Sequence, residues 1–316
     1  MSLEAPPQVE LRSLDHCLAC GGRHLGKLAM VYHFAGQRFP SAECRDCGMR
    51  FLRVQPTGRM LERMYSAEYF DTDFRCGRSE ATAGDEAAFR AENDGLLDRI
   101  ERFRGVGRLL DVGCAEGLLI KRAGLRGWSA AGVELSSDAV ARGRAMGLTI
   151  HEGTLDSAPI PEASQDVVYM GDVLEHVPDC RATAEQVARV LVPGGHLILR
   201  GPTTTHSLAR GLALRAYGLL GREIALHEPP YHLWEFTPRS LTTLLASVGL
   251  EMVLLEQAKI PPGRPHGSKS ALQRLVLNAI DSVNLPITRL ANMLGDRVFL
   301  VARRVPSLGG RTSPQR

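Results

Sequence analysis

What the sequence lacks narrows the class of protein before any motif is considered. No run of about 18 consecutive apolar residues occurs, so we expect no transmembrane helix. The first residues, MSLEAPPQVELRS, carry no basic segment ahead of an apolar stretch, and we therefore expect no secretory signal and a cytoplasmic, reducing location. The chain also has no large excess of positive or negative charge, since its net charge is only +3. This argues against a large nucleic-acid footprint.

Cysteines are few, but four of the seven form two close C-x-x-C pairs. The four residues are Cys17, Cys20, Cys44 and Cys47. In a reducing compartment such pairs favour a tetrahedral zinc site over a redox pair or incidental thiols. We expect a zinc ribbon over residues 1–56, with strands around 28–34, 37–42 and 49–54. Zn²⁺ would supply its folding energy, because so small a module buries little apolar surface.

A glycine-rich turn lies near the centre of the chain, between an apolar run and a helical pattern. Residues 109–120 read LLDVGCAEGLLI, in which a strand ends near Asp111 and Gly113 and a helix begins near Gly117. Backbone N–H groups of such a turn can face an anionic or carboxylate-bearing ligand. The G-x-G-x-x-G fingerprint of dinucleotide-binding domains is absent, since Ala115 lies between the two glycines.

A second short strand, residues 129–134, ends in Glu134. A carboxylate at this point can accept both ribose hydroxyls of a nucleoside-containing cofactor. Ser136 or Ser137 then caps a helix that runs to Gly147. The pattern of strand, helix and strand continues to residue 200 and predicts an α/β fold with a mostly parallel, doubly wound sheet.

Five motifs, LLDVGCAEG, AAGVELS, EGTLDSAPIP, QDVVYMGDVLEHVPD and LVPGGHLIL, resemble class I S-adenosylmethionine-dependent methyltransferases in their order and spacing. The resemblance implies a domain over residues 105–304, with a seven-stranded Rossmann-like sheet whose last strand is antiparallel. It implies S-adenosylmethionine as cofactor. The residues expected at the cofactor are Asp111, Gly113, Cys114, Gly117, Glu134, Leu135, Thr154, Leu155 and Asp172.

The segment between the two modules, residues 57–104, is expected to be a helical linker or cap, with an amphipathic helix over residues 85–104. A zinc ribbon followed by Tyr65, Tyr69 and Phe70 resembles a subset of bacterial methyltransferases that act on natural products or nucleotide-linked sugars. These aromatic residues are expected to lie over the cofactor or substrate, or to pack between the modules.

Two segments, about 203–231 and 259–295, exceed what such a core needs. Long excursions on the ligand side of a sheet are usually lids, so we expect helical lid insertions here. Contact with a membrane surface or formation of a homodimer is the competing interpretation. The tail, residues 305–316, is expected to be disordered.

Two histidines are candidate catalytic bases. Methyl transfer is an in-line displacement, and an oxygen or nitrogen acceptor also needs a proton removed. His176, in LEHVP, lies after the fourth strand, where Glu175 could orient it, although a role in the cofactor pocket is equally open. His232, in HLWEF, is expected at the mouth of the pocket, or else packs beside Trp234. We see no second metal cluster in the sequence, and we invoke no metal-assisted mechanism.

The sequence thus predicts a methyltransferase that acts on a small-molecule acceptor, most simply at oxygen. Carbon methylation of a nucleotide-linked sugar is an alternative, but such relatives carry a longer C-terminal domain. RNA base methylation, with the zinc module as RNA reader, has weak support from short basic patches at 99–108 and 303–304. A zinc-ribbon interaction protein without activity is the fourth possibility, and the intact Asp111, Glu134 and Asp172 argue against it.

Overall fold

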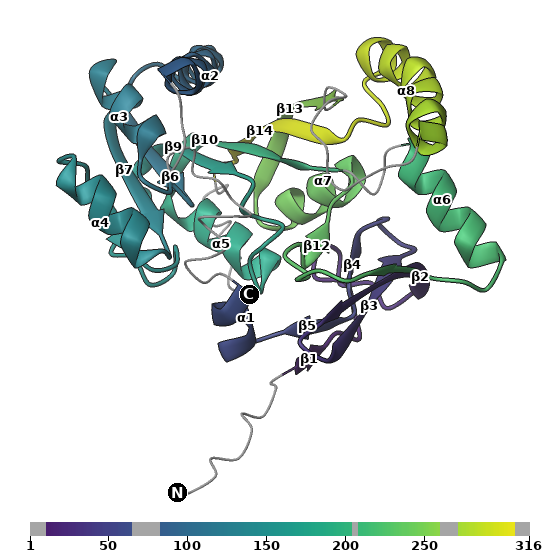
Figure 1. The fold of residues 1–316 in the computed structure, drawn as a ribbon. Helices are drawn as coiled ribbons and strands as arrows, with labels where there is room; N and C mark the ends of the chain where they lie inside the picture. The colour runs from purple at the N-terminus through teal and green to yellow at the C-terminus, as the bar shows by residue number, and fades with distance from the viewer. Residues whose placement is uncertain (1–10, 65–82, 204–207, 260–270, 307–316) are drawn as a thin grey trace, which may run out of the picture.

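The computed structural model describes residues 11–64, 83–203, 208–259 and 271–306 (Figure 1). The aromatic residues Tyr65, Tyr69 and Phe70 lie outside these ranges, and so does most of the expected C-terminal tail. Two larger sheets contain most of the described strands. A two-stranded antiparallel ribbon accompanies them, formed by β1 (Leu11–Ser13) and β5 (Val54–Pro56).

Seven strands form the largest sheet, in the order β13-β14-β10-β9-β6-β7-β8. They are β6 (Arg108–Val112), β7 (Ser129–Glu134), β8 (Ile150–Glu152), β9 (Gln165–Gly171), β10 (Leu191–Pro202), β13 (Leu250–Ala258) and β14 (Arg297–Arg304). β14 runs antiparallel to β10 and β13, while the remaining neighbours are parallel. The predicted doubly wound sheet with an antiparallel last strand is confirmed, and its strand order reverses at β6, where ligands of such sheets bind.

Helices cover this sheet because its strands direct apolar residues alternately to either side. Leu109 and Val167 face one side, where α2 and α3 pack, and Leu110 and Val168 face the other, where α5 and α7 pack. The helices are α2 (Ala83–Glu101), α3 (Leu118–Leu125), α4 (Ser137–Ala145), α5 (Cys180–Val190) and α7 (Pro238–Ser247). The core therefore lies in two layers, one on each face of the sheet.

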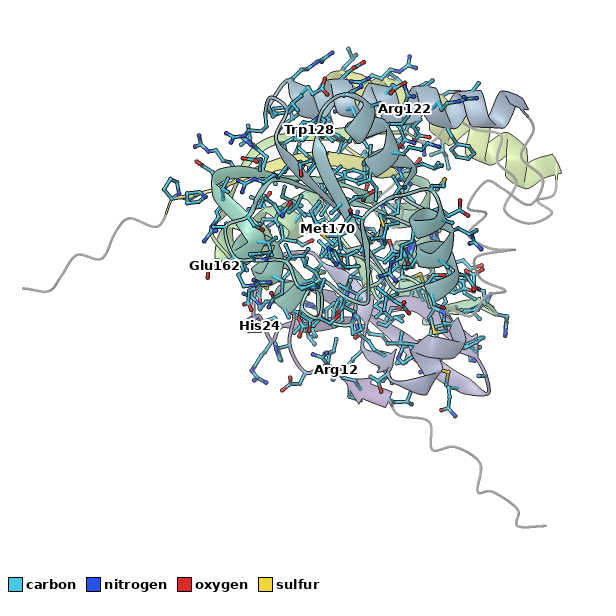
Figure 2. All side chains as sticks on the ribbon, turned by 90° about the vertical axis from the view of Figure 1, so that its left-hand side faces the viewer. Arg12, His24, Arg122, Trp128, Glu162 and Met170 are labelled. Atoms are coloured by element: carbon cyan, nitrogen blue, oxygen red, sulfur yellow. The ribbon has the colours of Figure 1, made fainter. Side chains whose placement is uncertain are left out.

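Polar bonds hold α2 against the region of α3. Arg122 donates to both carboxylate oxygens of Asp94 at 2.9 and 2.6 Å, and the Trp128 indole donates to Glu101 at 3.1 Å. Figure 2 shows Arg122 and Trp128 in this layer. Phe89, near the start of α2, is 39% exposed, so the predicted apolar stripe is wrong at that residue. The reason is that residues 87–92 are all exposed, and the helix buries only its later turns.

The predicted start of α4 is confirmed by its cap, and α7 begins with a cap of its own. The Ser136 side chain accepts from the Ala139 amide at the start of α4. Thr237 and Ser240 form a reciprocal capping box at the start of α7, with Pro238 in the first turn. Such caps satisfy amides that have no partner within the helix, and each stabilises its helix by about 1 kcal/mol.

The N-terminal module forms the second sheet, in the order β11-β2-β3-β4-β12. Its strands are β2 (Leu25–Phe34), β3 (Gln37–Cys44), β4 (Arg50–Leu52), β11 (Ile224–Leu226) and β12 (Trp234–Glu235). The short helix α1 (Arg59–Met64) follows β5. β11 and β12 both come from the chain after β10. β11 lies within residues 203–231, so part of that expected helical lid extends the N-terminal sheet instead.

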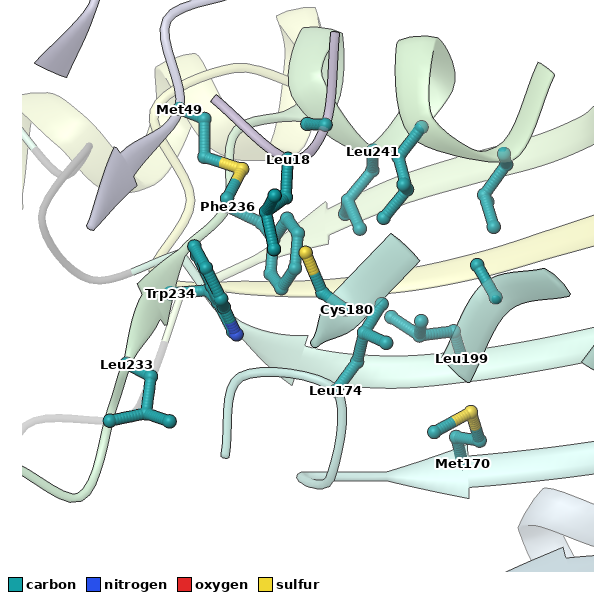
Figure 3. Packing of buried hydrophobic residues seen from close by; sticks show 14 of the residues in the cluster. Leu18, Met49, Met170, Leu174, Cys180, Leu199, Leu233, Trp234, Phe236 and Leu241 are labelled. Carbon is teal, nitrogen blue, oxygen red and sulfur yellow. The ribbon is translucent and has the colours of Figure 1, made fainter. Parts of the chain in front are cut away.

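One continuous apolar core joins the two sheets (Figure 3). Met49 of the N-terminal module packs in the same cluster as Trp234, Cys180 and Leu241. The Arg181 guanidinium, at the start of α5, donates to two backbone carbonyls of the first cysteine loop. The N-terminal module is therefore packed as part of the molecule's interior.

Two further helices lie together at one side of the molecule, α6 (Leu208–Leu219) and α8 (Ala271–Ala291) (Figure 1). α6 packs against β2 and α8, and α8 packs against β13. In the part of the chain that the structure describes, no helix is long and apolar enough to cross a membrane.

Candidate active site

The glycine turn connects β6 to α3 through three residues with positive φ. Gly113 and Gly117 have φ of 73° and 83°, and Ala115 has φ of 48°. A Cβ on Gly113 would lie 2.4 Å from Val173 Cγ2, so glycine is required there for space as well as for conformation. Ala115 adopts a conformation that costs a residue with a side chain about 1 kcal/mol.

The amides of this turn are less available than the sequence suggested. The amides of Gly113 and Cys114 both donate to the Val133 carbonyl, at 2.8 and 3.2 Å, and the Gly117 amide donates to the Cys114 carbonyl at 2.9 Å. The expectation that these N–H groups face a ligand is therefore wrong for all three. The turn packs so closely on β7 that its own backbone satisfies them.

Glu134, at the end of β7, lies across the turn and is almost fully buried. One carboxylate oxygen accepts from the Ala115 amide and the other from the Ser136 amide, both at 2.9 Å. Each carboxylate oxygen has two lone pairs, so each retains one for a further donor. The next residue, Leu135, is 66% exposed, an apolar surface beside a carboxylate that can still accept hydrogen bonds.

The loop after β8 lies at the same carboxyl edge of the sheet. The Thr154 hydroxyl donates to Asp156 at 2.5 Å, and the Thr154 amide donates to the Ser157 hydroxyl at 2.9 Å. The Leu155 side chain is buried in the main core, so only its backbone is available to a ligand. Thr154 and Asp156, by contrast, present exposed polar groups.

Asp111, one residue before the end of β6, is a buried acid close to Glu134. Burial, and secondarily the charge of Glu134, raise the pKa of Asp111 to about 8. At neutral pH this carboxyl is therefore largely protonated, because burial and the neighbouring Glu134 both disfavour its charged form.

Asp172 follows β9 with φ of 56° and is held by an arginine that the sequence analysis missed. Arg297, the first residue of β14, donates from Nη2 to both Asp172 carboxylate oxygens, at 2.5 and 2.6 Å. The two residues are far apart in the chain, and β14 brings them together only because it inserts beside β10. Nothing local in the sequence indicates this ion pair.

His176 and His232 lie side by side, with ring centroids 4.9 Å apart and the rings edge to face. His176 Nδ1 lies 3.0 Å from the Tyr231 carbonyl. Because a carbonyl only accepts, Nδ1 carries the proton and Nε2 keeps a lone pair. The sequence had suggested that Glu175 orients this ring. Glu175 Oε1 is 3.9 Å from His176 Nε2, too far for a hydrogen bond, so the Tyr231 carbonyl orients the ring instead.

The two histidines have opposite proton affinities. Burial, together with the nearby charge of His232, lowers the pKa of His176 to about 3. Burial also acts to lower the pKa of His232, but nearby carboxylates outweigh it. The Glu235 carboxylate is 3.5 Å from His232 Nδ1, and the charges of Glu175 and Asp172 add to its effect, so the pKa of His232 is raised. Burial raises the pKa of Glu175 to about 8. His232 is therefore the stronger base of the pair.

The same residues form a group that could hold a metal ion. One ligand atom each from Glu175, His176 and His232 lies within 4.8 Å of the others. Two imidazoles and a carboxylate suit several divalent transition ions. No second metal cluster was expected from the sequence; the fold brings these three candidate ligands together because the pairing of β12 with β4 carries His232 to a turn 56 residues earlier in the chain.

The four cysteines of the two C-x-x-C pairs converge at the base of the N-terminal sheet. The Cys17 and Cys47 sulfurs are 3.6 Å apart, the Cys20 and Cys44 sulfurs are 3.6 Å apart, and all four lie within 4.8 Å of one another. Four sulfurs bound tetrahedrally at a Zn–S distance of about 2.3 Å would be separated by about 3.8 Å. The Gly22 amide also donates to the Cys20 sulfur at 3.3 Å.

Hydrogen bonds connect this cysteine cluster to the segment that carries His232. The Leu52 amide donates to the Leu233 carbonyl at 3.0 Å, and the Leu233 amide donates to the Glu175 carbonyl at 2.9 Å. The Thr237 hydroxyl donates to the Cys47 carbonyl at 3.4 Å. The segment is thus fixed between the N-terminal module and the turn after β9.

The sheet, with its single antiparallel strand, and the glycine turn closed by an acid on the next strand define a Rossmann-like S-adenosylmethionine-dependent methyltransferase. The sequence model described as a methyltransferase domain matches residues 85–255, more than half of the chain. The chain therefore belongs to this methyltransferase family, and the predicted class and the predicted use of S-adenosylmethionine are confirmed.

Relatives of known name match part of the chain. A ubiquinone biosynthesis O-methyltransferase of Alkalilimnicola ehrlichii is 33% identical over 137 residues, which cover 40% of this chain and 53% of the relative. A protein of the same name from Azoarcus is 30% identical over 175 residues, covering 50% and 71%. The match with the first of these thus spans about half of that protein's length.

Solved structures with similar folds are more distant in sequence. A methyltransferase from Archaeoglobus fulgidus is 17% identical, with a TM-score of 0.46, and the match covers 67% of this chain and 93% of that one. One from Mesorhizobium loti is 20% identical, with a TM-score of 0.43 and coverage of 62% and 90%.

Proposed function

We propose that this methyltransferase transfers a methyl group to an oxygen of a small-molecule acceptor, with His232 as the general base. The observation that carries the proposal is the contact between His232 and His176, and His176 lies in the turn after β9, at the carboxyl edge of the sheet where ligands of doubly wound sheets bind. The matched relatives, which are named ubiquinone biosynthesis O-methyltransferases, support a hydroxyl acceptor.

The carboxyl ends of β6, β7 and β8 would hold the cofactor. Bound S-adenosylmethionine supplies a methyl group on a positively charged sulfonium. Glu134 would accept the ribose hydroxyls through the lone pairs that its two amide partners leave unused. The remaining residues of the proposed cofactor site are Asp111, Gly113, Cys114, Gly117, Leu135, Thr154, Leu155 and Asp172.

His232 would remove the acceptor's proton. Its Nδ1 faces Glu235, which leaves Nε2 to accept the hydroxyl proton while the new O–C bond forms and the C–S bond breaks. The resulting imidazolium is stabilised by Glu235 and by the other nearby carboxyl groups. His176, with its low pKa, would stay neutral and form part of the pocket wall.

We further propose that the four cysteines bind zinc and that this zinc is structural. The sulfur separations match a tetrahedral thiolate site, and the cluster is mostly buried. A site with four protein ligands leaves no open position for a substrate. Its role would be to fold the module whose strand β4 pairs with β12.

Label transfer tests the proposed function. Methyl-labelled S-adenosylmethionine is incubated with the protein and an extract separated into small molecules, RNA and protein. We expect label in the small-molecule fraction, and once the acceptor is identified, His232→Asn should lower turnover by about 10²- to 10⁴-fold without changing cofactor binding. His196→Asn, in the middle of β10 beside Val167 and Arg303 and away from the carboxyl edge of the sheet, should leave turnover unchanged.

Other outcomes would contradict the proposal in distinct ways. Label in RNA would make the N-terminal module a nucleic-acid reader, and label on a sugar carbon would remove the need for a base at oxygen. Activity that disappears with a chelator and returns with a divalent ion, while zinc stays on the cysteines, would assign Glu175, His176 and His232 to a metal instead of proton transfer.

A further inference from the structure

The outward face of α6 is apolar. Leu212 and Leu219, which are seven residues apart and so lie on one line of the helix, are 51% and 90% exposed. Leu220, just after the helix, is 70% exposed, while Leu214 on the opposite side is buried. An ordinary surface helix would carry polar residues on its outward face, so this arrangement indicates a surface that is covered in use.

The neighbouring helix, α8, repeats the pattern in the part whose side chains the structure describes. Val283 and Leu290, again seven residues apart, are 57% and 89% exposed. Asn284 and Thr288, by contrast, are buried against the rest of the protein, and the Asn284 amide donates to the Leu294 carbonyl at 3.1 Å. The helix therefore buries polar groups and exposes apolar ones.

The charge of these helices indicates what covers them. The sequence of α6 contains Arg210 and Arg215 but no acidic residue, and Arg222 follows shortly after it. Three arginines are exposed: Arg215 in α6, Arg222 just after it, and Arg289 in α8. Together α6 and α8 carry four arginines and one acid, Asp281, so a second copy would bring the same excess of positive charge, which costs energy, whereas an anionic surface would attract it.

We propose that the exposed faces of α6 and α8 form a docking face for anionic lipid bilayers. Leucines flanked by arginines are the composition of helices that lie in the interface of a membrane, with their apolar side among the headgroups and upper acyl chains. Such docking needs no membrane-spanning helix. The proposal depends on the two helices alone and does not require the proposed acceptor or base.

Vesicle flotation of the full chain tests the docking face. The probes are vesicles of phosphatidylcholine alone and of phosphatidylcholine mixed with phosphatidylglycerol in equal parts. We expect binding to the anionic vesicles, little binding to the neutral ones, and weakening by salt. Leu219→Asp together with Leu220→Asp should lower vesicle affinity at least about tenfold, because each leucine loses its burial in the bilayer.

The matched control is Leu125→Asp, a leucine that is 72% exposed at the end of α3, a helix on the opposite side of the molecule from α6 in Figure 1. It should leave vesicle binding unchanged, and unaltered thermal unfolding would show that both variants fold. Failure of the wild-type chain to bind anionic vesicles, or equal loss in the control, would overturn the proposal. A dimer in light scattering that the α6 variant dissociates would instead identify a second copy as the occupant.

Discussion

The buried His176 predicts how the stability of the protein responds to acid. Its pKa is about 3 in the folded protein, against about 6.5 in an unfolded chain. Because the folded-state value is depressed, the stability is present in full above pH 6.5 and is lost as pH falls toward 3. Between pH 7 and pH 5 this histidine alone should remove about 2 kcal/mol from the free energy of unfolding, at about 1.4 kcal/mol per pH unit.

The variant that isolates this contribution is His176→Asn. The asparagine amide can occupy the place of Nδ1 and donate to the Tyr231 carbonyl, while the titrating ring is removed. Urea unfolding of both proteins at pH 5, 6 and 7 gives the difference in the free energy of unfolding. We expect this difference to shift by about 2 kcal/mol in favour of the variant as pH falls from 7 to 5.

Other groups do not obscure this comparison. The raised pKa values of Asp111 and Glu175 make the protein more stable as pH falls, which opposes the effect of His176 in the wild type. Their contributions are largely common to both proteins and cancel in the difference. His176 is neutral in the folded protein between pH 7 and pH 5, so its loss removes no charge beside His232. A difference independent of pH would refute the reasoning.

Three further predictions concern the cofactor turn and the metal site. Glu134→Ala should weaken S-adenosylmethionine binding in calorimetry by an order of magnitude or more, since a hydrogen bond to a charged group contributes about 1.5–3 kcal/mol. Ala115→Gly should stabilise the protein by up to about 1 kcal/mol, seen as a thermal midpoint a few degrees higher, because glycine adopts the φ of 48° without strain. Cys44→Ser should release zinc from the purified protein in elemental analysis, whereas Cys180→Ser, at a buried cysteine outside the cluster, should retain it.

Each of these has an outcome that would count against it. Unchanged cofactor affinity would remove Glu134 from the site. A lower midpoint after Ala115→Gly would mean that the alanine methyl makes contacts that outweigh its backbone strain. Zinc retained after Cys44→Ser would mean that three sulfurs suffice, and the absence of zinc from the wild type would remove the metal altogether.

The regular part of the fold could be predicted because each element carries a local signal. β7 was predicted with the bounds that the structure gives, since it is a short apolar run that ends in an acid. The start of α4 followed from the two serines at 136 and 137. These signals are local, so they can be recognised in the sequence without knowledge of the tertiary structure.

The active site was only partly predictable, because its partners come from distant parts of the chain. β11 and β12 are too short to show alternation, and they exist because the edges of β2 and β4 offer unpaired backbone groups. The Asp172–Arg297 ion pair depends on where β14 inserts. Both histidines were candidates from the sequence, but their unequal proton affinities come from burial and from carboxylates that only the fold brings near them.

The pairing of Phe51 in β4 with Trp234 in β12 also affects the order in which the protein can fold. The cofactor turn is built from elements that are near neighbours in sequence, whereas His232 lies beside a contact between residues 183 positions apart in the chain. Contacts of such long range form late, because closing a long loop costs entropy before any contact is gained. Under the proposed roles of zinc and His232, a newly made chain would complete its donor pocket before it positions the base, and a chain without zinc would bind the methyl donor but hold no fixed base for the acceptor.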